Sequence, residues 1–242
     1  MKKLVLGIAF LGLFFALFAY ALPGNGNDDK GPLSKITFIH YKKGFAPAKP
    51  PGTPGGGKGG SVCYGFLASG AKWKTPENYL VNPTSSGLNE TFVFNSVNFG
   101  TSEWETYGGN IFESGSIDYT AYYSENSMDG NNTVSFGSYS EPGVIAVTNV
   151  WGYFSGPPKT RELVEWDMLF NTYYSWGDAD SNPALMDLPN IATHELGHSA
   201  GMADLYTSGC TEETMYGYST EGETKKRDLN AGDITGIQKL YA

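Results

Sequence analysis

Apolar residues recur along the chain with the periods of a mixed α and β domain. The clearest alternation spans residues 162–171, where Val164, Trp166, Met168 and Phe170 share one face of an extended segment. Alternating or β-branched runs predict further strands at residues 36–41, 79–83, 117–123, 132–136 and 144–151. Apolar spacing and capping side chains predict helices at residues 88–107, from about Asp187 and from about Asn230. This order of elements predicts an α+β fold.

The N-terminus has the pattern of an export signal. Lys2 and Lys3 precede an apolar run over residues 4–20, and Ala19-Tyr20-Ala21 fits a cleavage site. A membrane anchor is the alternative, but the run is near the lower length limit for a spanning helix. We therefore predict a signal peptide at residues 1–21, a secreted protein, and no stable membrane span after signal removal.

The next segment is distinct in composition. Residues 22–61 contain one short predicted strand, which carries His40, and then a stretch at 46–61 with four prolines and six glycines. Such a stretch is typical of a linker. We predict a propeptide and linker at residues 22–61 and a single catalytic domain at residues 62–242.

Charge divides the chain in the same place. Residues 22–62 have a net charge of +4, from six lysines and two aspartates, whereas residues 63–242 have a net charge of −15. An acidic domain argues against nucleic acid as a partner, because phosphates require a basic surface. The basic leader is either an electrostatic partner of the acidic domain or a solvated tail.

The chemistry-bearing motif is His194-Glu195-Leu196-Gly197-His198. Histidines four residues apart lie on one face of a helix, so both imidazoles can reach one metal ion. Glu195 is suited to take a proton from a metal-activated water and to deliver it to a leaving amine.

The residues after this motif supply a candidate third ligand. Gly201 can adopt the left-handed conformation that ends a helix, which lets the chain return toward the metal at Asp204. The chain has three histidines, and His40 lies in the poorly structured leader. We therefore expect Asp204, with His194 and His198, to bind one Zn²⁺ and leave a fourth position open.

This extended motif resembles that of the matrixin-like metzincin zinc metallopeptidases, with aspartate as the third ligand as in the snapalysin group. The segment Thr214-Met215-Tyr216-Gly217-Tyr218 is similar to the Met-turn of that clan, and residues 233–241 resemble the last matrixin helix. The resemblance implies a twisted mixed β-sheet, an active-site helix, a C-terminal helix and a zinc cleft between two lobes. It also implies that Met215 lies beneath the metal and that Tyr218 stabilises the oxyanion or walls the cleft.

Cys63 and Cys210 are the two cysteines of the chain. Export to an oxidising compartment favours a disulfide between them. The alternative is that Cys63 silences the zinc as matrixin propeptide cysteines do, but the surrounding sequence Val62-Cys63-Tyr64-Gly65 lacks that family's Pro-Arg-Cys-Gly pattern.

A second metal site has weaker support. Asp178, Asp180 and Asn182 offer oxygen ligands at a spacing that suggests Ca²⁺, and a solvated acidic loop is the alternative.

The leading interpretation is a secreted zinc endopeptidase acting on proteins or peptides. One alternative is an extracellular zinc amidase of narrow specificity that acts on cell-wall peptides. Another is a non-catalytic binding module with structural zinc. Glu195 argues against it, because a structural site has no need for a carboxylate beside its ligand and tends to be closed by four protein ligands. The sequence leaves the oligomeric state and the substrate preference open.

Overall fold

The computed structural model describes residues 30–45 and 62–242. The predicted signal peptide and the Pro/Gly-rich linker lie outside the described residues. The strands are β1 (Leu33–Lys42), β2 (Glu77–Val81), β3 (Phe112–Ile117), β4 (Asn132–Gly137), β5 (Val144–Tyr153), β6 (Glu162–Asn171), β7 (Trp176–Gly177), β8 (Met186–Asp187) and β9 (Tyr218–Ser219). The α-helices are α1 (Glu90–Gly108), α2 (Leu188–Ser199) and α3 (Ala231–Tyr241), and short 3₁₀ turns occupy Pro158–Thr160, Ser208–Cys210 and Lys225–Arg227.

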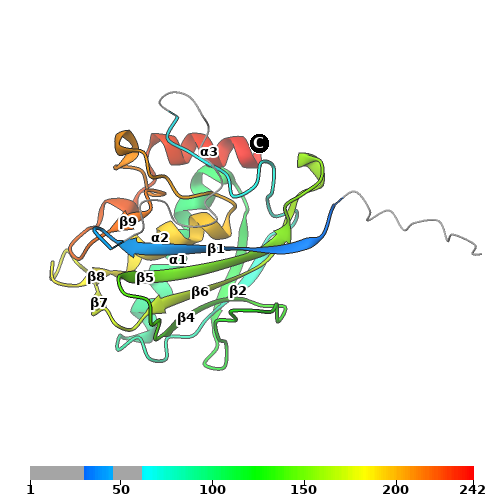
Figure 1. Ribbon diagram of the computed structural model, residues 1–242. Helices are drawn as coiled ribbons and strands as arrows, with labels where there is room; N and C mark the ends of the chain where they lie inside the picture. The colour runs from blue at the N-terminus through cyan, green and yellow to red at the C-terminus, as the bar shows by residue number, and fades with distance from the viewer. Residues whose placement is uncertain (1–29, 46–61) are drawn as a thin grey trace, which may run out of the picture.

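Seven strands form one mixed sheet in the order β3-β2-β4-β6-β5-β1-β9 (Figure 1). The first four strands in this order are mutually parallel, and β5 runs antiparallel to β6. β1 pairs antiparallel with β5 along almost its whole length and then parallel with β9. The N-terminal strand therefore lies inside the sheet, between segments more than 100 residues later in the chain.

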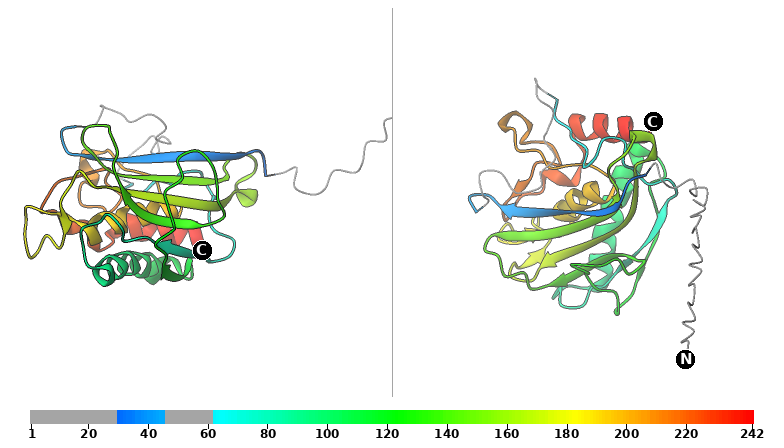
Figure 2. Two further views of the ribbon diagram at one scale, coloured as in Figure 1. Left: turned by 90° about the horizontal axis from the view of Figure 1, so that it is seen from below. Right: turned by 45° about the vertical axis from the view of Figure 1, so that its right-hand side comes forward.

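The three helices cover one face of the sheet (Figure 2). Helix α1 begins at Asn89, whose side chain accepts hydrogen bonds from the backbone N–H groups of the first turn. It packs closely on α2, because Gly100 has no side chain: a Cβ there would lie 2.8 Å from Leu196 and 3.0 Å from the backbone of Thr193. The buried Trp104 indole also donates a 2.7 Å hydrogen bond to the carbonyl oxygen of Thr193.

Helix α2 is buried along nearly its whole length. It therefore has no polar face directed at solvent. Its N-cap is Asp187, whose carboxylate accepts from the N–H of Asn190 at 2.8 Å. Helix α3 begins with a capping box formed by Asn230 and Asp233. Both caps agree with the sequence prediction.

Most predicted elements are confirmed within a few residues, including the strand at 162–171 and all three helices. The strand predicted at residues 117–123 is wrong: β3 is Phe112–Ile117, and the chain after Ile117 turns. Only Phe112 in β3 is buried, so this strand has no apolar alternation for the sequence to reveal.

One strand of the main sheet, β1, lies upstream of residue 62, where we predicted that the catalytic domain begins, and that boundary stays a prediction. Leu33–Lys42 is a strand of the main sheet, and Phe38 belongs to the main hydrophobic core. Whether the leader is removed as a propeptide stays a prediction.

Cys63 and Cys210 form a disulfide, which agrees with the predicted pairing and leaves neither cysteine as a free thiol. Within residues 30–45 and 62–242, no helix is both long and apolar enough to cross a bilayer.

Candidate metal and catalytic site

Helix α2 presents His194 and His198 from one face, and the neighbouring backbone orients both rings. His194 Nδ1 lies 2.7 Å from the carbonyl oxygen of Thr214, and His198 Nδ1 lies 3.0 Å from that of Met202. A carbonyl oxygen can only accept, so each Nδ1 carries a proton and donates it. Each Nε2 therefore keeps a lone pair that can bind a metal ion.

The chain returns to these rings after α2 ends. Gly201 has φ of 102°, a conformation that favours glycine, and a Cβ there would lie 2.8 Å from the carbonyl oxygen of Ala71. Three residues later, Asp204 Oδ1 lies 3.2 Å from Nε2 of His194 and 3.4 Å from Nε2 of His198. All three predicted ligands thus meet at one point.

The donor set fits a zinc ion. The ligand atoms of His194, His198 and Asp204 lie within 4.8 Å of one another, and all three residues are buried. Among the described residues, neither His194 Nε2 nor Asp204 Oδ1 has a hydrogen-bond partner, although both atoms are fully buried. Buried polar atoms are normally satisfied, so a cation at this point would explain the two exceptions.

Burial opposes the ionisation of Asp204, but His198 and His194 outweigh it and hold the pKa of Asp204 below its usual range. Asp204 Oδ2 also accepts a 3.1 Å hydrogen bond from the hydroxyl of Tyr206. Burial and the Asp204 carboxylate raise the pKa of Tyr206, so the phenol stays protonated and can donate. The sequence analysis did not identify Tyr206, because no motif marks it.

Met215 packs against α2 between the two histidines, and its place beneath a metal ion stays a prediction. Its side chain is fully buried, and a Cβ at Gly197 would lie 2.2 Å from its sulfur. Gly197, between the two histidines, therefore lets the methionine pack directly against α2.

Glu195 projects from α2 beside the metal-binding rings and is fully buried. Its Oε2 accepts a 2.6 Å hydrogen bond from the hydroxyl of Thr148 on β5, and its Oε1 lies 3.0 Å from Nδ1 of His40. Burial raises the pKa of Glu195 above its usual value.

His40 corrects the expectation that this histidine lies in a poorly structured leader. It is on β1, is buried, and has its ring centroid 4.0 Å from that of His194. Burial, and then the positive charge of Lys226, lowers the pKa of His40 to about 3, so the imidazole is neutral at pH 7. The strand that carries His40 was predicted from the sequence, but nothing in the sequence indicated that it lies beside His194.

Tyr218 is half-buried on β9, and its ring packs 5.2 Å from Tyr206 and 5.6 Å from Tyr216. Whether Tyr218 stabilises an oxyanion or lines a cleft stays a prediction.

A cationic side chain from elsewhere in the chain binds the acidic loop that suggested Ca²⁺. Arg227 bonds to Asp178 at 2.7 Å and to Asp180 at 2.6 Å, and it also pairs with the buried N-cap Asp187. Two of the predicted calcium-binding carboxylates thus have a cationic partner, and Ca²⁺ binding stays a prediction.

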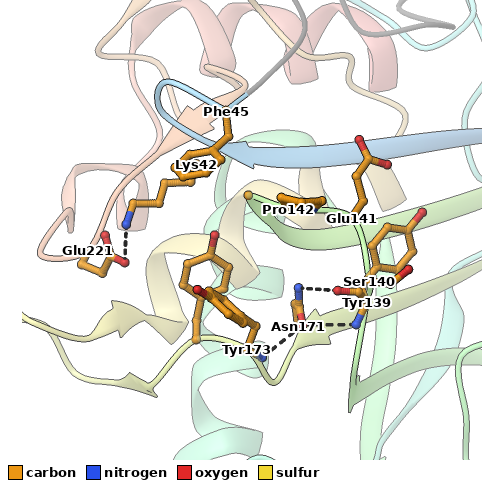
Figure 3. Close-up of a pocket in the computed structure, with 11 residues that line it drawn as sticks. Lys42, Phe45, Tyr139, Ser140, Glu141, Pro142, Asn171, Tyr173 and Glu221 are labelled. Atoms are coloured by element: carbon orange, nitrogen blue, oxygen red, sulfur yellow. Dashed lines mark hydrogen bonds and ion pairs between the residues drawn. The ribbon is translucent and has the colours of Figure 1, made fainter.

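A separate pocket of about 400 Å³ opens at the C-terminal end of β1 (Figure 3). It is lined by Lys42, Phe45, Tyr139, Ser140, Glu141, Pro142, Gly143, Asn171, Tyr173, Tyr174 and Glu221. The Lys42–Glu221 ion pair borders it, at 2.7 Å. None of the metal-binding residues lines this pocket.

Comparisons with known proteins agree with this geometry. Residues 124–242 match the family model for matrixin, peptidase M10. Metalloendoproteinase 2-MMP of Arabidopsis thaliana is 41% identical over 68 residues, which are 27% of this chain and 17% of that protein. Metalloendoproteinase 1-MMP of the same plant is 39% identical over 61 residues, which are 25% of this chain and 16% of that protein. The chain thus spans about a sixth of the length of the curated relatives it matches.

A crystal structure of metalloproteinase-II from Bacteroides fragilis is similar over 72% of this chain and 54% of that one, with 12% identity and a TM-score of 0.37. A similarity at this level adds nothing to the assignment. The matrixin match covers β5, which carries Thr148, α2, which carries His194, Glu195 and His198, and the segment with Asp204. In this part of the chain the protein is similar to the matrixin-like metzincins.

Proposed function

We propose that the protein is a secreted zinc endopeptidase that hydrolyses peptide bonds in proteins or peptides. His194, His198 and Asp204 would hold the ion, which would supply a Lewis acid that activates water and polarises the scissile carbonyl. Glu195 takes the proton of the attacking water and delivers it to the nitrogen of the leaving amine as the C–N bond breaks.

One observation carries this proposal. Two buried Nε2 atoms and one buried carboxylate oxygen converge, and a second buried carboxylate, that of Glu195, projects from the helical turn between the two histidines. Thr148 holds one oxygen of Glu195, which orients the carboxylate. Three protein ligands leave a coordination position open, and a general base beside an open position is the arrangement of a hydrolytic zinc site.

The aspartate ligand has a consequence for pH dependence. A third ligand that is anionic adds negative charge to the metal and reduces its Lewis acidity relative to a third histidine. We expect Asp204→His to shift the pH profile of turnover. An unchanged profile would argue against Asp204 as a ligand.

The experiment uses the zinc-loaded Ile39→Pro chain, in which β1 is displaced, as the parent and compares it with the same chain that also carries Glu195→Gln. Zinc content is measured by mass spectrometry, and turnover is measured with casein and with an internally quenched peptide. We expect Glu195→Gln to retain the zinc and to lose about 10²- to 10⁴-fold in kcat/KM. Glu113→Gln, at an exposed position on β3, is the matched control and should behave as the parent.

Turnover of the same size in the parent and in Glu195→Gln would contradict the assigned general base. If every zinc-loaded form is inactive on both substrates, including Ile39→Pro, which displaces β1, the endopeptidase assignment is wrong. Hydrolysis of cell-wall peptides by the same preparations would then identify an amidase, and inactivity there would leave a structural zinc module.

A further inference from the structure

β1 lies where an extended peptide would join the sheet. It pairs with β5 antiparallel from Leu33 opposite Tyr153 to Tyr41 opposite Val144, and its end pairs with β9 (Figures 1 and 2). Proteins bind extended peptides by the same addition of a strand to a sheet edge. Without β1, the edge of β5 that carries Thr148 would be unpaired.

Alternate side chains of β1 face opposite sides. Thr37 donates a 2.6 Å hydrogen bond to Asn149 of β5, and Tyr41 donates one of 2.6 Å to Glu141, both away from the metal site. Phe38 and His40 point to α2. Strand alternation therefore sends two consecutive inward side chains into the catalytic centre.

Each of these two rings covers one metal-binding histidine. The Phe38 ring stacks on that of His198 with centroids 3.8 Å apart and planes 8° apart. The His40 ring lies 4.0 Å from that of His194, and its Nδ1 is 3.0 Å from Glu195 Oε1.

The consequence is that no substrate can reach the centre in this arrangement. His194 and Glu195 have no exposed surface, and His198 retains 1%. Each oxygen of Glu195 already has a partner, Thr148 on one and His40 on the other, and the His40 ring lies on the side from which a water molecule would approach the carboxylate. A general base must lie within hydrogen-bond reach of the proton it abstracts.

We propose that Leu33–Lys42 is an occluding strand, which fills the path of an extended substrate and holds His40 against Glu195, so that the chain is latent until β1 leaves β5. This inference rests on the proposed function. Cys63 is disulfide-bonded and supplies no thiol for this purpose. His40 instead contacts the general base, Glu195. His40, His194 and Glu195 form one closely spaced group, and His194, His198 and Asp204 form another.

Lysine side chains attach this strand and the residues before it to the acidic domain. Lys42 pairs with Glu221 at 2.7 Å, Lys30 pairs with Glu162, and Lys35 donates to the carbonyl oxygen of Glu125 at 2.5 Å. The basic leader thus contacts an acidic domain, one of the two alternatives that the charge distribution raised. Part-exposed pairs of this kind contribute little each, which is compatible with a strand that must be released.

The test displaces β1 within the full chain. In Ile39→Pro, the pyrrolidine ring fixes φ at about −65°, far from the extended value of an antiparallel strand, in the middle of a segment that is paired on β5, and it should distort that pairing. Ile39→Val is the matched control, since valine keeps the donor and the β-branched shape. Hydrogen exchange at the amides of residues 144–153 reports directly whether β5 has lost its partner.

Access is then measured by titrating acetohydroxamate, a small zinc chelator, into the zinc-loaded proteins by calorimetry. We expect its Kd to fall at least tenfold in Ile39→Pro and to stay unchanged in Ile39→Val. Equal affinity in the parent and in an exchange-verified Ile39→Pro would overturn the occlusion. If this variant does not fold, the double variant Phe38→Ala with His40→Ala removes both covering rings, and equal affinity there would overturn it as well.

Turnover separates this inference from the proposed function. Tighter chelator binding with faster peptide hydrolysis in Ile39→Pro supports both. Tighter binding without hydrolysis in any variant supports the occluding strand and overturns the endopeptidase. Hydrolysis at the same rate and chelator binding with the same affinity in the parent and in Ile39→Pro supports the endopeptidase and overturns the occlusion.

Discussion

The carboxylate of Asp233 accepts a 2.6 Å hydrogen bond from the backbone N–H of Thr214. It also accepts one from the N–H of Met215 at 3.2 Å, so α3 fixes the turn beneath the metal site. The carbonyl oxygen of Thr214 in turn orients His194. Asp233 therefore acts on the site through a backbone segment that contacts a ligand.

We expect Asp233→Ala to weaken zinc binding by about 10- to 100-fold, the usual cost of losing a group that orients a ligand. The measurement is a competition titration against a chromogenic chelator at fixed pH. Asp228→Ala removes a nearby exposed carboxylate and should leave the affinity unchanged. Equal affinities in all three proteins would mean that the turn holds its position without Asp233.

Arg227 supports the start of the active-site helix. Its guanidinium bonds to Asp187, the buried N-cap of α2, at 2.9 Å through Nε. Arg227→Met would leave this buried carboxylate without its charged partner and should lower the free energy of unfolding by about 3–5 kcal/mol. Lys225→Met removes an exposed pair with Glu212 and should cost at most about 1 kcal/mol. Denaturant titration of both variants tests the difference, and similar midpoints would contradict it.

Asp167 on β6 should make stability depend on pH. Burial raises its pKa to about 8, and the nearby carboxylates of Glu165 and Asp129 add to the shift. The unfolded carboxyl releases its proton near pH 4, whereas the folded one retains it to about pH 8. Between these values the folded state binds more protons, so stability falls as pH rises.

We therefore expect Tm to fall from pH 5 to pH 8, and Asp167→Asn to flatten this decline because the amide does not titrate. Scanning calorimetry at half-unit pH steps measures both slopes. A parental slope that persists unchanged in Asp167→Asn would assign the dependence to other groups.

The disulfide should contribute to stability through the chain that it closes. Cys63 and Cys210 are 147 residues apart in sequence, and a crosslink over so long a segment restricts the unfolded chain strongly. We expect the double variant Cys63→Ser with Cys210→Ser to lose about 2–5 kcal/mol in unfolding free energy. The same loss should follow reduction of the parent, and a reducing agent should not affect the variant.

Local pattern was sufficient for the elements whose residue types alternate or whose first residue is a capping side chain. Apolar and polar residues alternate along β6, although both of its faces are buried from Glu165 onward, and Asp187 and Asn230 mark the starts of α2 and α3. The meeting of His194 and His198 was also predictable, because two histidines four apart on a helix share a face. β3 was missed because it is polar.

The remaining features depend on contacts between distant segments. The strand that carries His40 was predicted, but nothing near it in sequence indicates that it pairs with β5, more than 100 residues later. Thr148 and Tyr206 were not predicted for the same reason, since each meets the site only through the fold. Glycine is normally unfavourable inside a helix, but the close packing of α1 on α2 requires Gly100.

The most direct test of the account is zinc-edge anomalous diffraction from crystals of the zinc-loaded full chain. We predict one anomalous peak at about 2.0–2.2 Å from Nε2 of His194, Nε2 of His198 and one carboxylate oxygen of Asp204, with Glu195 beside the ion and unbound. A peak at another place, or an ion closed by four protein ligands, would contradict the catalytic site described above.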